Sequence, residues 1–316
     1  MQQQTMQAWQ FAGPDQPLTL SDKTLPALAD DEILIDNQAS GINPVDWKFI
    51  EANPLDWPHG QIPGVDGAGI VMDVGAGVDD SMTGRRVAYH NSLQLDGSYA
   101  TYTVLKASRV MQLPDALPFD LAAALPCPML TAWQAVSKIP VNRGALVLVA
   151  GLGSVNKLSV QLLNKAGFEV HALSGSLNKD EACSLGITEV HRTADSLPQQ
   201  YYGVIDAVGP EHAASLVPLL KANGHIVCVQ GRIEQPVDEA FTRTISYHEV
   251  ALGALHQYGD SDDWVALMQE GEALLGEVVS EQLTVESPAV YAFSKMNEAL
   301  KHSKQTKEKT VIGKAV

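Results

Sequence analysis

Short apolar stretches alternate with polar and turn-forming residues along the first hundred positions of the chain. The alternation predicts strands at 33–35, 87–89 and 99–105. A glycine/proline turn is expected at 40–46 and a glycine-rich bend at 63–69. Little of this part has helical periodicity. The pattern therefore predicts a mostly-β module of the partly open barrel kind.

From residue 119 onward, the pattern changes to alternating helices and strands. The helices are expected at 119–125, 130–137 and 213–221. Apolar runs predict strands that include 145–149, 168–173, 202–208, 226–229 and 250–255. Six strands with intervening helices form a doubly wound parallel sheet. The pattern changes again near residue 260, with helices at 261–275 and 294–303 and a last strand at 310–312.

These changes of pattern predict two domains. We expect a catalytic domain made of residues 1–117 and 258–316, and a dinucleotide-binding domain made of residues 118–257. The strand expected at 250–255 could lie at a sheet edge and pair across a homodimer.

The turn after the strand at 145–149 is the most informative stretch of the chain. It reads Gly151-Leu152-Gly153-Ser154-Val155-Asn156 and leads into an amphipathic helix. The glycines let the backbone approach a pyrophosphate, which amides at the helix N-terminus bind. Asn156 stands where a third glycine usually allows close packing of helix and strand. The stretch predicts half of a dinucleotide-binding βαβ unit.

Composition narrows the class of protein. The 316 residues include 45% apolar and 18% charged positions and carry a net charge of −16, which disfavours nucleic acid as a partner. The cysteines Cys127, Cys183 and Cys228 are far apart, which predicts neither disulfides nor a structural zinc lobe and suits the cytoplasm. The first ten residues lack an apolar leader pattern, and no apolar run approaches 18 residues. We expect no membrane span.

Three segments resemble one known family. Residues 41–48 (GINPVDWK) resemble its NPVDxK segment, residues 63–71 (PGVDGAGIV) its PGxDxAGxV bend, and residues 125–133 (LPCPMLTAW) the helix start that faces the nicotinamide. With the order of a β module, a dinucleotide domain and a return segment, the chain resembles the medium-chain dehydrogenase/reductase superfamily, in its zinc-free quinone and alkenal reductase branch. The resemblance implies a Rossmann domain beside a GroES-like domain.

Zinc-dependent members of that superfamily hold a catalytic metal with a Cys, a His and a second Cys. The corresponding positions here are Asn43, Val65 and Cys127, so two of the three ligands are missing. His59 and His90 could substitute, but we expect both to lie in surface loops. The site is therefore predicted to hold no metal. Without a Lewis acid, hydride transfer to a quinone or an α,β-unsaturated carbonyl is favoured over alcohol oxidation.

The resemblance also assigns roles, each with a plainer alternative. Asn43 is placed beside the nicotinamide, although it could be an Asx-turn residue. Asp46 and Lys48 are candidate catalytic residues, with Lys48 near the oxygen of an enolate, or they are a solvated pair. Trp47 and Cys127 are expected in the substrate pocket, although a free cysteine is commonly a core residue.

The end of the strand at 168–173 indicates which cofactor is bound. Enzymes that use NAD place an acid there, whereas this chain has Ser174, Ser176 and Lys179, which suit a 2′-phosphate. NADPH is therefore predicted, although the segment could be an ordinary turn with Asn178 as N-cap. The full set of predicted cofactor-binding residues is Thr131, Gly151, Gly153, Ser154, Val155, Ser174, Ser176, Lys179, Val208, Gly209 and Gly231.

The favoured hypothesis is a zinc-independent, NADPH-dependent oxidoreductase that acts on a small molecule. Two alternatives stay open: a binding or structural protein on the same fold that has lost cofactor use, and a metal-dependent alcohol dehydrogenase. We also expect Cys127 to react faster with an alkylating agent than Cys183 and Cys228.

Overall fold

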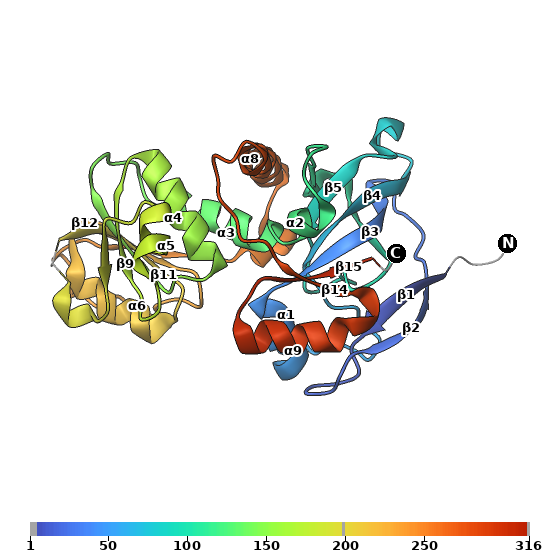
Figure 1. The fold of residues 1–316 in the computed structure, drawn as a ribbon, viewed down its shortest axis with the longest axis horizontal. Coiled ribbons are helices and arrows are strands. Elements are labelled where there is room, and N and C mark those ends of the chain that lie inside the picture. The colour runs from blue at the N-terminus through green and yellow to red at the C-terminus, as the bar shows by residue number, and fades with distance from the viewer. Residues whose placement is uncertain (1–4, 198–199, 315–316) are drawn as a thin grey trace. The chain divides into compact units, whose positions relative to one another are not determined.

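The computed structural model describes residues 5–197 and 200–314 (Figure 1). Its contacts divide the chain into two compact units, one made of residues 1–127 and 253–316 and the other of residues 128–252. The sequence places these boundaries after 117 and 257. The first unit extends to residue 127 because the carbonyl of Ala123 packs against Gly41 and the amide of Cys127 is bound by Asp66.

The first unit is built mainly from antiparallel strands. A seven-stranded sheet has the order β14-β15-β3-β4-β5-β7, with β6 paired to β3, and β1 and β2 form a separate pair. The strands are β1 (Thr5–Gln10), β2 (Thr19–Thr24), β3 (Glu32–Ile42), β4 (Asp66–Val74), β5 (Arg86–His90), β6 (Tyr102–Lys106), β7 (Val110–Gln112), β14 (Ala289–Ala292) and β15 (Thr310–Gly313). Inward residues of β3, β4 and β5, such as Ile33, Val71 and Val87, form one core cluster.

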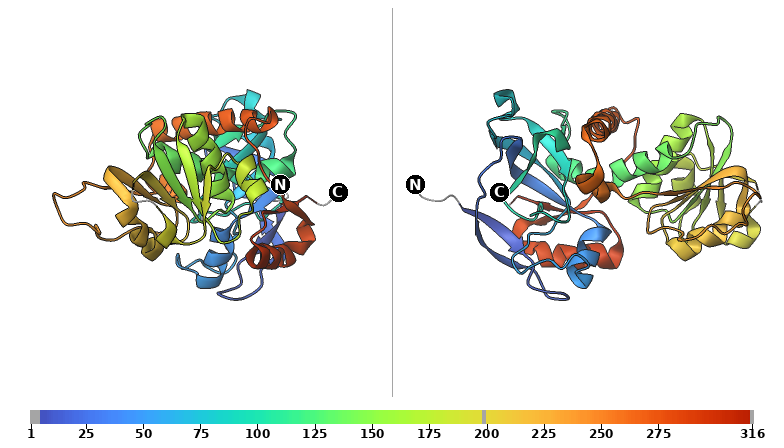
Figure 2. Two further views of the ribbon diagram at one scale, coloured as in Figure 1. Left: turned by 60° about the vertical axis from the view of Figure 1, so that its left-hand side comes forward. Right: turned by 180° about the vertical axis from the view of Figure 1, so that it is seen from behind.

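Helices of the first unit pack against these strands. They are α1 (Pro44–Ala52), α2 (Phe119–Ala123), α7 (Leu255–Tyr258), α8 (Ser261–Val279) and α9 (Met296–Thr306). Helices α1 and α9 lie side by side in both figures (Figures 1 and 2). Their residues Ile50 and Leu300 share a core cluster with Trp9 and Trp57. The helices predicted at 261–275 and 294–303 and the last strand are confirmed.

One turn predicted in this unit is wrong, and one predicted bend is shorter than expected. Residues 40–42 continue β3, and residues 44–46 begin α1. Pro44 occupies the first helical turn, where a fixed φ and a missing N–H are tolerated. The end of the 63–69 bend is already strand, because β4 begins at Asp66. Residues 63–65 precede β4 as a bend in which Gly64 has a φ of 102°, so the first half of the predicted bend is confirmed.

The second unit is a doubly wound parallel sheet, as predicted. Its six strands have the order β10-β9-β8-β11-β12-β13, and each pairing is parallel. They are β8 (Leu146–Ala150), β9 (Glu169–Leu173), β10 (Glu189–His191), β11 (Tyr201–Asp206), β12 (Leu220–Cys228) and β13 (Ser246–Glu249). The chain winds outward in both directions from β8 and β11, so the topological switch point lies between these two strands.

Helices cover both faces of this sheet (Figure 2). They are α3 (Pro126–Ser137), α4 (Ser154–Ala166), α5 (Lys179–Ser184) and α6 (Pro210–Leu216). Ala135, Val160 and Ala182 of α3, α4 and α5 pack in one core cluster, whereas Ala213 and Leu216 of α6 pack in the other. Among the helices of the described residues, none is both long and apolar enough to cross a membrane.

The predictions for two elements of this unit are corrected. The helix expected at 213–221 ends at Leu216, because a 3₁₀ turn containing Pro218 follows and β12 begins at Leu220. The strand expected at 250–255 is absent. Residues 252–258 form short helical turns, and the sixth strand is β13, four residues long. The suggested pairing of 250–255 across a dimer therefore loses its basis.

The space around two glycines predicts opposite effects of replacing them, because Gly41 lies in the contact between α2 and β3 and Gly276 is exposed on α8. A Cβ added to Gly41 would lie 2.1 Å from the carbonyl oxygen of Ala123, whereas one added to the exposed helical Gly276 would meet nothing within 4 Å. We expect Gly41→Ala to lower the free energy of unfolding by about 3 kcal/mol. Gly276→Ala should raise it by roughly 0.5–1 kcal/mol. Urea unfolding measures both, and equal effects would contradict this packing.

Candidate functional site

Asp66, at the first position of β4, is the centre of a buried polar cluster in the first unit. Strand register pairs it with Gly41 of β3 and with His90 of β5. Its carboxylate is fully buried and accepts hydrogen bonds from Asn43 Nδ2 at 2.8 Å and from the backbone amide of Cys127 at 2.9 and 3.0 Å. His90 Nδ1 lies 3.0 Å from its other oxygen. Groups from three other parts of the chain thus converge on one carboxylate.

Lys309 supplies the positive charge of this cluster. It directly precedes β15, whose Thr310 pairs with Ile42 of β3, and this register brings Lys309 next to Asn43. The buried ammonium donates to Asn43 Oδ1 at 2.6 Å and lies 3.9 Å from Asp66 Oδ2. Lys48, the lysine predicted from sequence, is instead exposed on α1, with its ammonium 5.8 Å from the ring of Trp47.

Asp46 is a second buried carboxylate, one turn into α1. Its two oxygens accept from the backbone amides of Asn43 at 2.7 Å and Val65 at 3.1 Å. Burial is the main cause that raises the pKa of Asp46 to about 7, and the charge of Asp66 adds to it. The amide of Asn43 and the charge of Lys309 lower the pKa in part. Asp46 therefore carries a proton that an exposed aspartate would have lost.

His90 is buried at the end of β5, so the expectation that it lies in a surface loop is wrong. His59 is exposed in a turn, as expected. The ring of His90 lies 5.7 Å from that of His256, centre to centre. Arg109 Nη1 donates to His256 Nδ1 at 3.1 Å, and the guanidinium lies over Trp264. Burial first, then His90 and Arg109, lower the pKa of His256 to about 3, so this imidazole is neutral.

The three positions that hold zinc in metal-dependent relatives do converge here, but their chemistry differs. Val65 offers an amide to Asp46. Both polar atoms of the Asn43 side chain are engaged, by Asp66 and by Lys309. Cys127 is the single one of the three with a ligand side chain. A buried ammonium next to Asn43 also repels a cation, so these residues do not fit a catalytic zinc ion.

Trp47 lies on α1 beside a pocket of the first unit. The pocket has a volume of about 500 Å³ and lies against α1, α9 and residues 15–18. Its apolar lining includes Leu18, Ile50 and Leu300. The ammonium of Lys307 is 4.4 Å from the Trp47 ring centre, which is cation–π distance. The predicted role of Trp47 with the substrate stays a prediction.

The predicted cofactor residues of the second unit gather at the carboxyl ends of its strands. Gly151 and Gly153 follow β8, and Ser154 and Val155 begin α4. A Cβ added to Gly153 would meet nothing within 4 Å, so the backbone is open to a ligand there. Asn156, fully buried, donates at 2.9 Å to the carbonyls of Ala150 and Gly151. Asn156 therefore fixes the turn in the place of a third glycine.

Three more predicted residues follow strands of the same sheet. Val208 and Gly209 follow β11, and their amides donate at 3.0 and 2.9 Å to Asp206, which the sequence analysis did not single out. Gly231 follows β12. Thr131 lies on α3 and is buried. Because strand ends next to a switch point bind nucleotides in this architecture, the edge can hold a dinucleotide.

The segment after β9 carries the residues predicted to bind the 2′-phosphate. Ser174 Oγ accepts from the amide of Leu177, and Ser176 and Lys179 are exposed. Asn178 caps α5 by accepting from the amide of Glu181, so its N-cap role is confirmed. Arg192, the residue after β10, donates hydrogen bonds to the carbonyls of Ser174 and Leu177 at 2.7 Å each. It places a second cation at this loop.

The exposure of the three cysteines differs from what their predicted order of reactivity with an alkylating agent requires. Cys183 is exposed, Cys127 is partly buried and Cys228 is buried. Burial raises the pKa of the Cys228 thiol. The slow reaction expected of Cys228 has structural support, but Cys183 lies on the solvent side of α5 and is not protected by its apolar neighbours.

A β-rich unit with a buried polar cluster and a nucleotide-binding parallel sheet define a class of two-domain oxidoreductase folds. Residues 29–115 match the alcohol dehydrogenase GroES-like domain. The chain is 31% identical to the 2-methylene-furan-3-one reductase of Solanum lycopersicum over 274 residues, 81% of this chain and 69% of that protein. It is 30% identical over 274 residues to the chloroplastic NADPH-dependent alkenal/one oxidoreductase of Arabidopsis thaliana, covering 81% and 70%.

A solved structure shows the same fold. The quinone oxidoreductase of Coxiella burnetii superposes with a TM-score of 0.77 at 23% identity, over 98% of this chain and 99% of that one. The chain belongs to the medium-chain dehydrogenase/reductase superfamily, in its quinone oxidoreductase-like branch. The predicted family and the predicted fold class are confirmed.

The raised pKa of Asp46 predicts a pH-dependent stability. The folded chain keeps the Asp46 proton up to about pH 7, whereas the ordinary pKa is 3.8. Between these values the folded state binds more protons, so the free energy of unfolding falls as pH rises, by up to roughly 1.4 kcal/mol per unit. Urea unfolding of wild type and Asp46→Asn from pH 4.5 to 6.5 should show a difference that changes with pH in this direction.

The control for this measurement is Gly276→Ala, which adds no titrating group. Its difference from wild type should be the same at each pH. A wild-type minus Asp46→Asn difference that is also constant with pH would show that Asp46 is ionised throughout.

Proposed function

We propose that this protein is a zinc-independent, NADPH-dependent oxidoreductase that transfers hydride to a quinone or to the β-carbon of an α,β-unsaturated carbonyl. The observation that carries the proposal is the ammonium of Lys309 on Asn43, at a position that holds a metal ligand in zinc-dependent relatives. A fixed positive charge there makes a metal unnecessary for charge balance. Acceptors that are already activated need no Lewis acid.

The residues at the carboxyl edge of the parallel sheet fit NADPH. The open backbone at Gly153 and the first-turn amides of α4 would hold the pyrophosphate. Ser174, Lys179 and Arg192 would surround the 2′-phosphate, and no acid stands at the end of β9. The Arabidopsis relative is named as NADPH-dependent, which supports the choice of cofactor.

NADPH, when bound, supplies the hydride, and the chain contributes binding and electrostatics. Hydride addition to an enone or quinone leaves negative charge on the carbonyl oxygen. The field of Lys309 stabilises such charge, and low polarity around the cluster strengthens this effect. Asn43 is held rigidly by Asp66 and Lys309, so it is oriented before the substrate arrives. Asp46 keeps a proton near neutral pH in the same cluster.

None of the three cysteines, all of which the structure describes, is in a disulfide. This suits a reducing compartment, and we include a cytoplasmic location in the proposal. A small molecule is the expected substrate.

Replacing Lys309 by methionine tests the role of its charge. We expect Lys309→Met to lower kcat with a quinone or an enal by about 100-fold, as loss of one preorganised charge does. The Kd for NADPH, measured by quenching of protein fluorescence, should stay within about twofold, because the charge of Lys309 belongs to the substrate-activating cluster. Circular dichroism checks folding, since a buried Asp66 without its counter-charge costs about 3–5 kcal/mol.

The control variant is Lys48→Met, which removes the exposed lysine of α1. Equal losses in Lys48→Met and Lys309→Met would contradict the assignment of the charge to Lys309. Chelation of the wild-type protein should leave turnover unchanged. The metal-dependent alternative would be favoured if chelation stopped turnover and added zinc restored it in the wild type but not in Cys127→Ala. The binding-protein alternative would be favoured if NADPH gave no saturable fluorescence signal.

Cofactor selectivity tests the loop after β9. Lys179→Ala and Arg192→Ala should each weaken NADPH binding by about 10-fold and leave NADH binding nearly unchanged, because each removes one cation facing the 2′-phosphate. Ser174→Asp should reverse the preference. The matched control is Lys221→Ala. Lys221 lies at the start of β12, so it is at the amino ends of the strands, away from the predicted cofactor residues at the carboxyl ends. Equal weakening of NADPH and NADH would show that these residues position the loop without reading the phosphate.

A further inference from the structure

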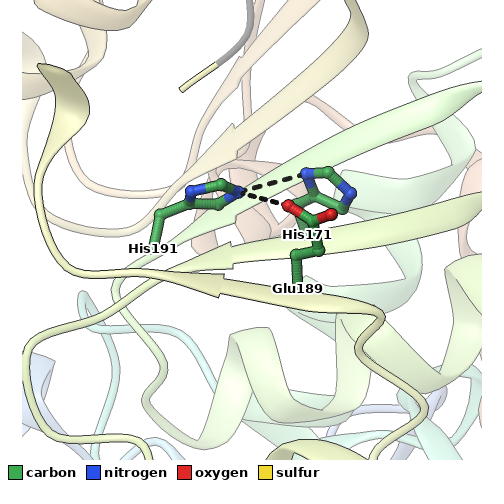
Figure 3. Close-up of side chains that lie close together, drawn as sticks. All are labelled: His171, Glu189 and His191. Atoms are coloured by element: carbon green, nitrogen blue, oxygen red, sulfur yellow. Dashed lines mark hydrogen bonds and ion pairs between the residues drawn. The ribbon is translucent and has the colours of Figure 1, made fainter. Parts of the chain in front are cut away.

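A cluster of two histidines and a glutamate lies at one edge of the parallel sheet, on strands β9 and β10. His171 is on β9, and Glu189 and His191 are two residues apart on β10, so both project from the same face. The register pairs Glu189 with His171. Figure 3 shows that the three side chains point toward one another. Within the described parts of the chain, this is the group of three whose ligand atoms all lie within 4.8 Å of one another.

Two of the three distances match those between the ligands of a tetrahedral metal ion, and the third is no longer than 4.8 Å. His191 Nε2 lies 3.3 Å from His171 Nδ1 and 3.3 Å from Glu189 Oε2 (Figure 3). Ligands bound about 2.0–2.1 Å from a tetrahedral zinc ion stand roughly 3.3–3.4 Å apart. Two imidazoles and one carboxylate are also a ligand set that zinc sites use when they keep an open coordination position.

The surroundings of His171 suit a ligand. Its side chain is 7% exposed and lies on β9, which is paired with β10. With Nδ1 toward the cluster, Nε2 lies 3.9 Å from Glu169 Oε1, so a second carboxylate is near the ring. Tyr201 Oη lies 2.9 Å from Nδ1, so metal binding exchanges that hydrogen bond for a metal bond. The side chain of Glu189 is 61% exposed and gives solvent ions access.

The opposite edge of the same sheet supplies a natural comparison. His225 of β12 and His248 of β13 stand in the same register relation, with His225 Nδ1 and His248 Nε2 3.2 Å apart. His225 pairs with Ser246, whereas His171 at the corresponding position pairs with Glu189. The two histidine pairs thus have equivalent geometry, but a carboxylate completes one of them alone.

We propose that His171, Glu189 and His191 form a binding site for a divalent transition-metal ion such as Zn²⁺. The site would join the short edge strand β10 to β9. It is separate from the positions Asn43, Val65 and Cys127, where relatives bind catalytic zinc, and it does not depend on the proposed reaction.

Titration with Co²⁺ tests the site, because the visible absorption of Co²⁺ becomes stronger when the ion is bound in a tetrahedral site. Tag-free full-length protein, first treated with a chelator, should bind one Co²⁺ per chain. His171→Ala, Glu189→Gln and His191→Ala should each weaken binding by at least about 10-fold. His248→Ala, which breaks the comparison pair, should bind as the wild type does. Circular dichroism confirms that each variant is folded.

Thermal unfolding gives a second readout. Zn²⁺ at about 100 times its Kd should raise the Tm of the wild type by roughly 5 °C or more and leave that of Glu189→Gln nearly unchanged. The proposal is overturned if the wild type shows no saturable binding at one equivalent, or if Glu189→Gln and His191→Ala bind Co²⁺ as tightly as wild type. It is also overturned if Cys127→Ala abolishes binding, because the ion would then lie at the catalytic positions.

Discussion

The buried carboxylate of Asp66 is the constraint on which the first unit depends. A charge taken out of water costs several kcal/mol unless donors and a counter-charge surround it. Here the donors come from the residue after β3, the end of β5 and the start of α3, and the counter-charge comes from the residue before β15. Satisfying one carboxylate thus fixes the relative positions of elements that are distant in sequence.

The same requirement fixes the orientation and the protonation of the cluster. Asn43, Lys309 and Asp46 are held by hydrogen bonds within the fold, so their side chains are oriented without a ligand. The neighbouring Asp46 carries its proton mainly because burial disfavours its charged form, and the charge of Asp66 adds to this effect. Stability and polarity of the cluster therefore have one physical origin.

The second unit uses the two kinds of edge that a parallel sheet offers. At the carboxyl ends of its strands, backbone amides and glycines are free of ladder pairing and can meet a phosphate. At its lateral edges, β10 and β13, paired strands place histidines side by side. Whether such a pair can hold a metal depends on one cross-strand neighbour, Glu189 or Ser246. The strand pairing is the same at both lateral edges, so the difference between them is the carboxylate of Glu189 in place of the hydroxyl of Ser246.

The sequence by itself determined the features that depend on local pattern. Apolar runs and the glycine turn at 151–156 predicted the parallel sheet, and the motifs at 41–48 and 63–71 predicted the family. The mistaken elements lie where local signals compete, as at Pro44, which begins α1 instead of closing a turn. Asp66 could have been singled out, since it stands within a recognised motif.

Only the tertiary structure decided which charged groups meet. Lys309 lies 266 positions from Asn43, and it reaches Asn43 because β15 pairs with β3 in one register. His90 and His256 are likewise brought together by packing, although they are 166 positions apart in the sequence. A residue pattern of period two shows which side chains share a face of one strand. It does not show which strand lies beside it, because long-range pairing is set by the burial of the whole sheet.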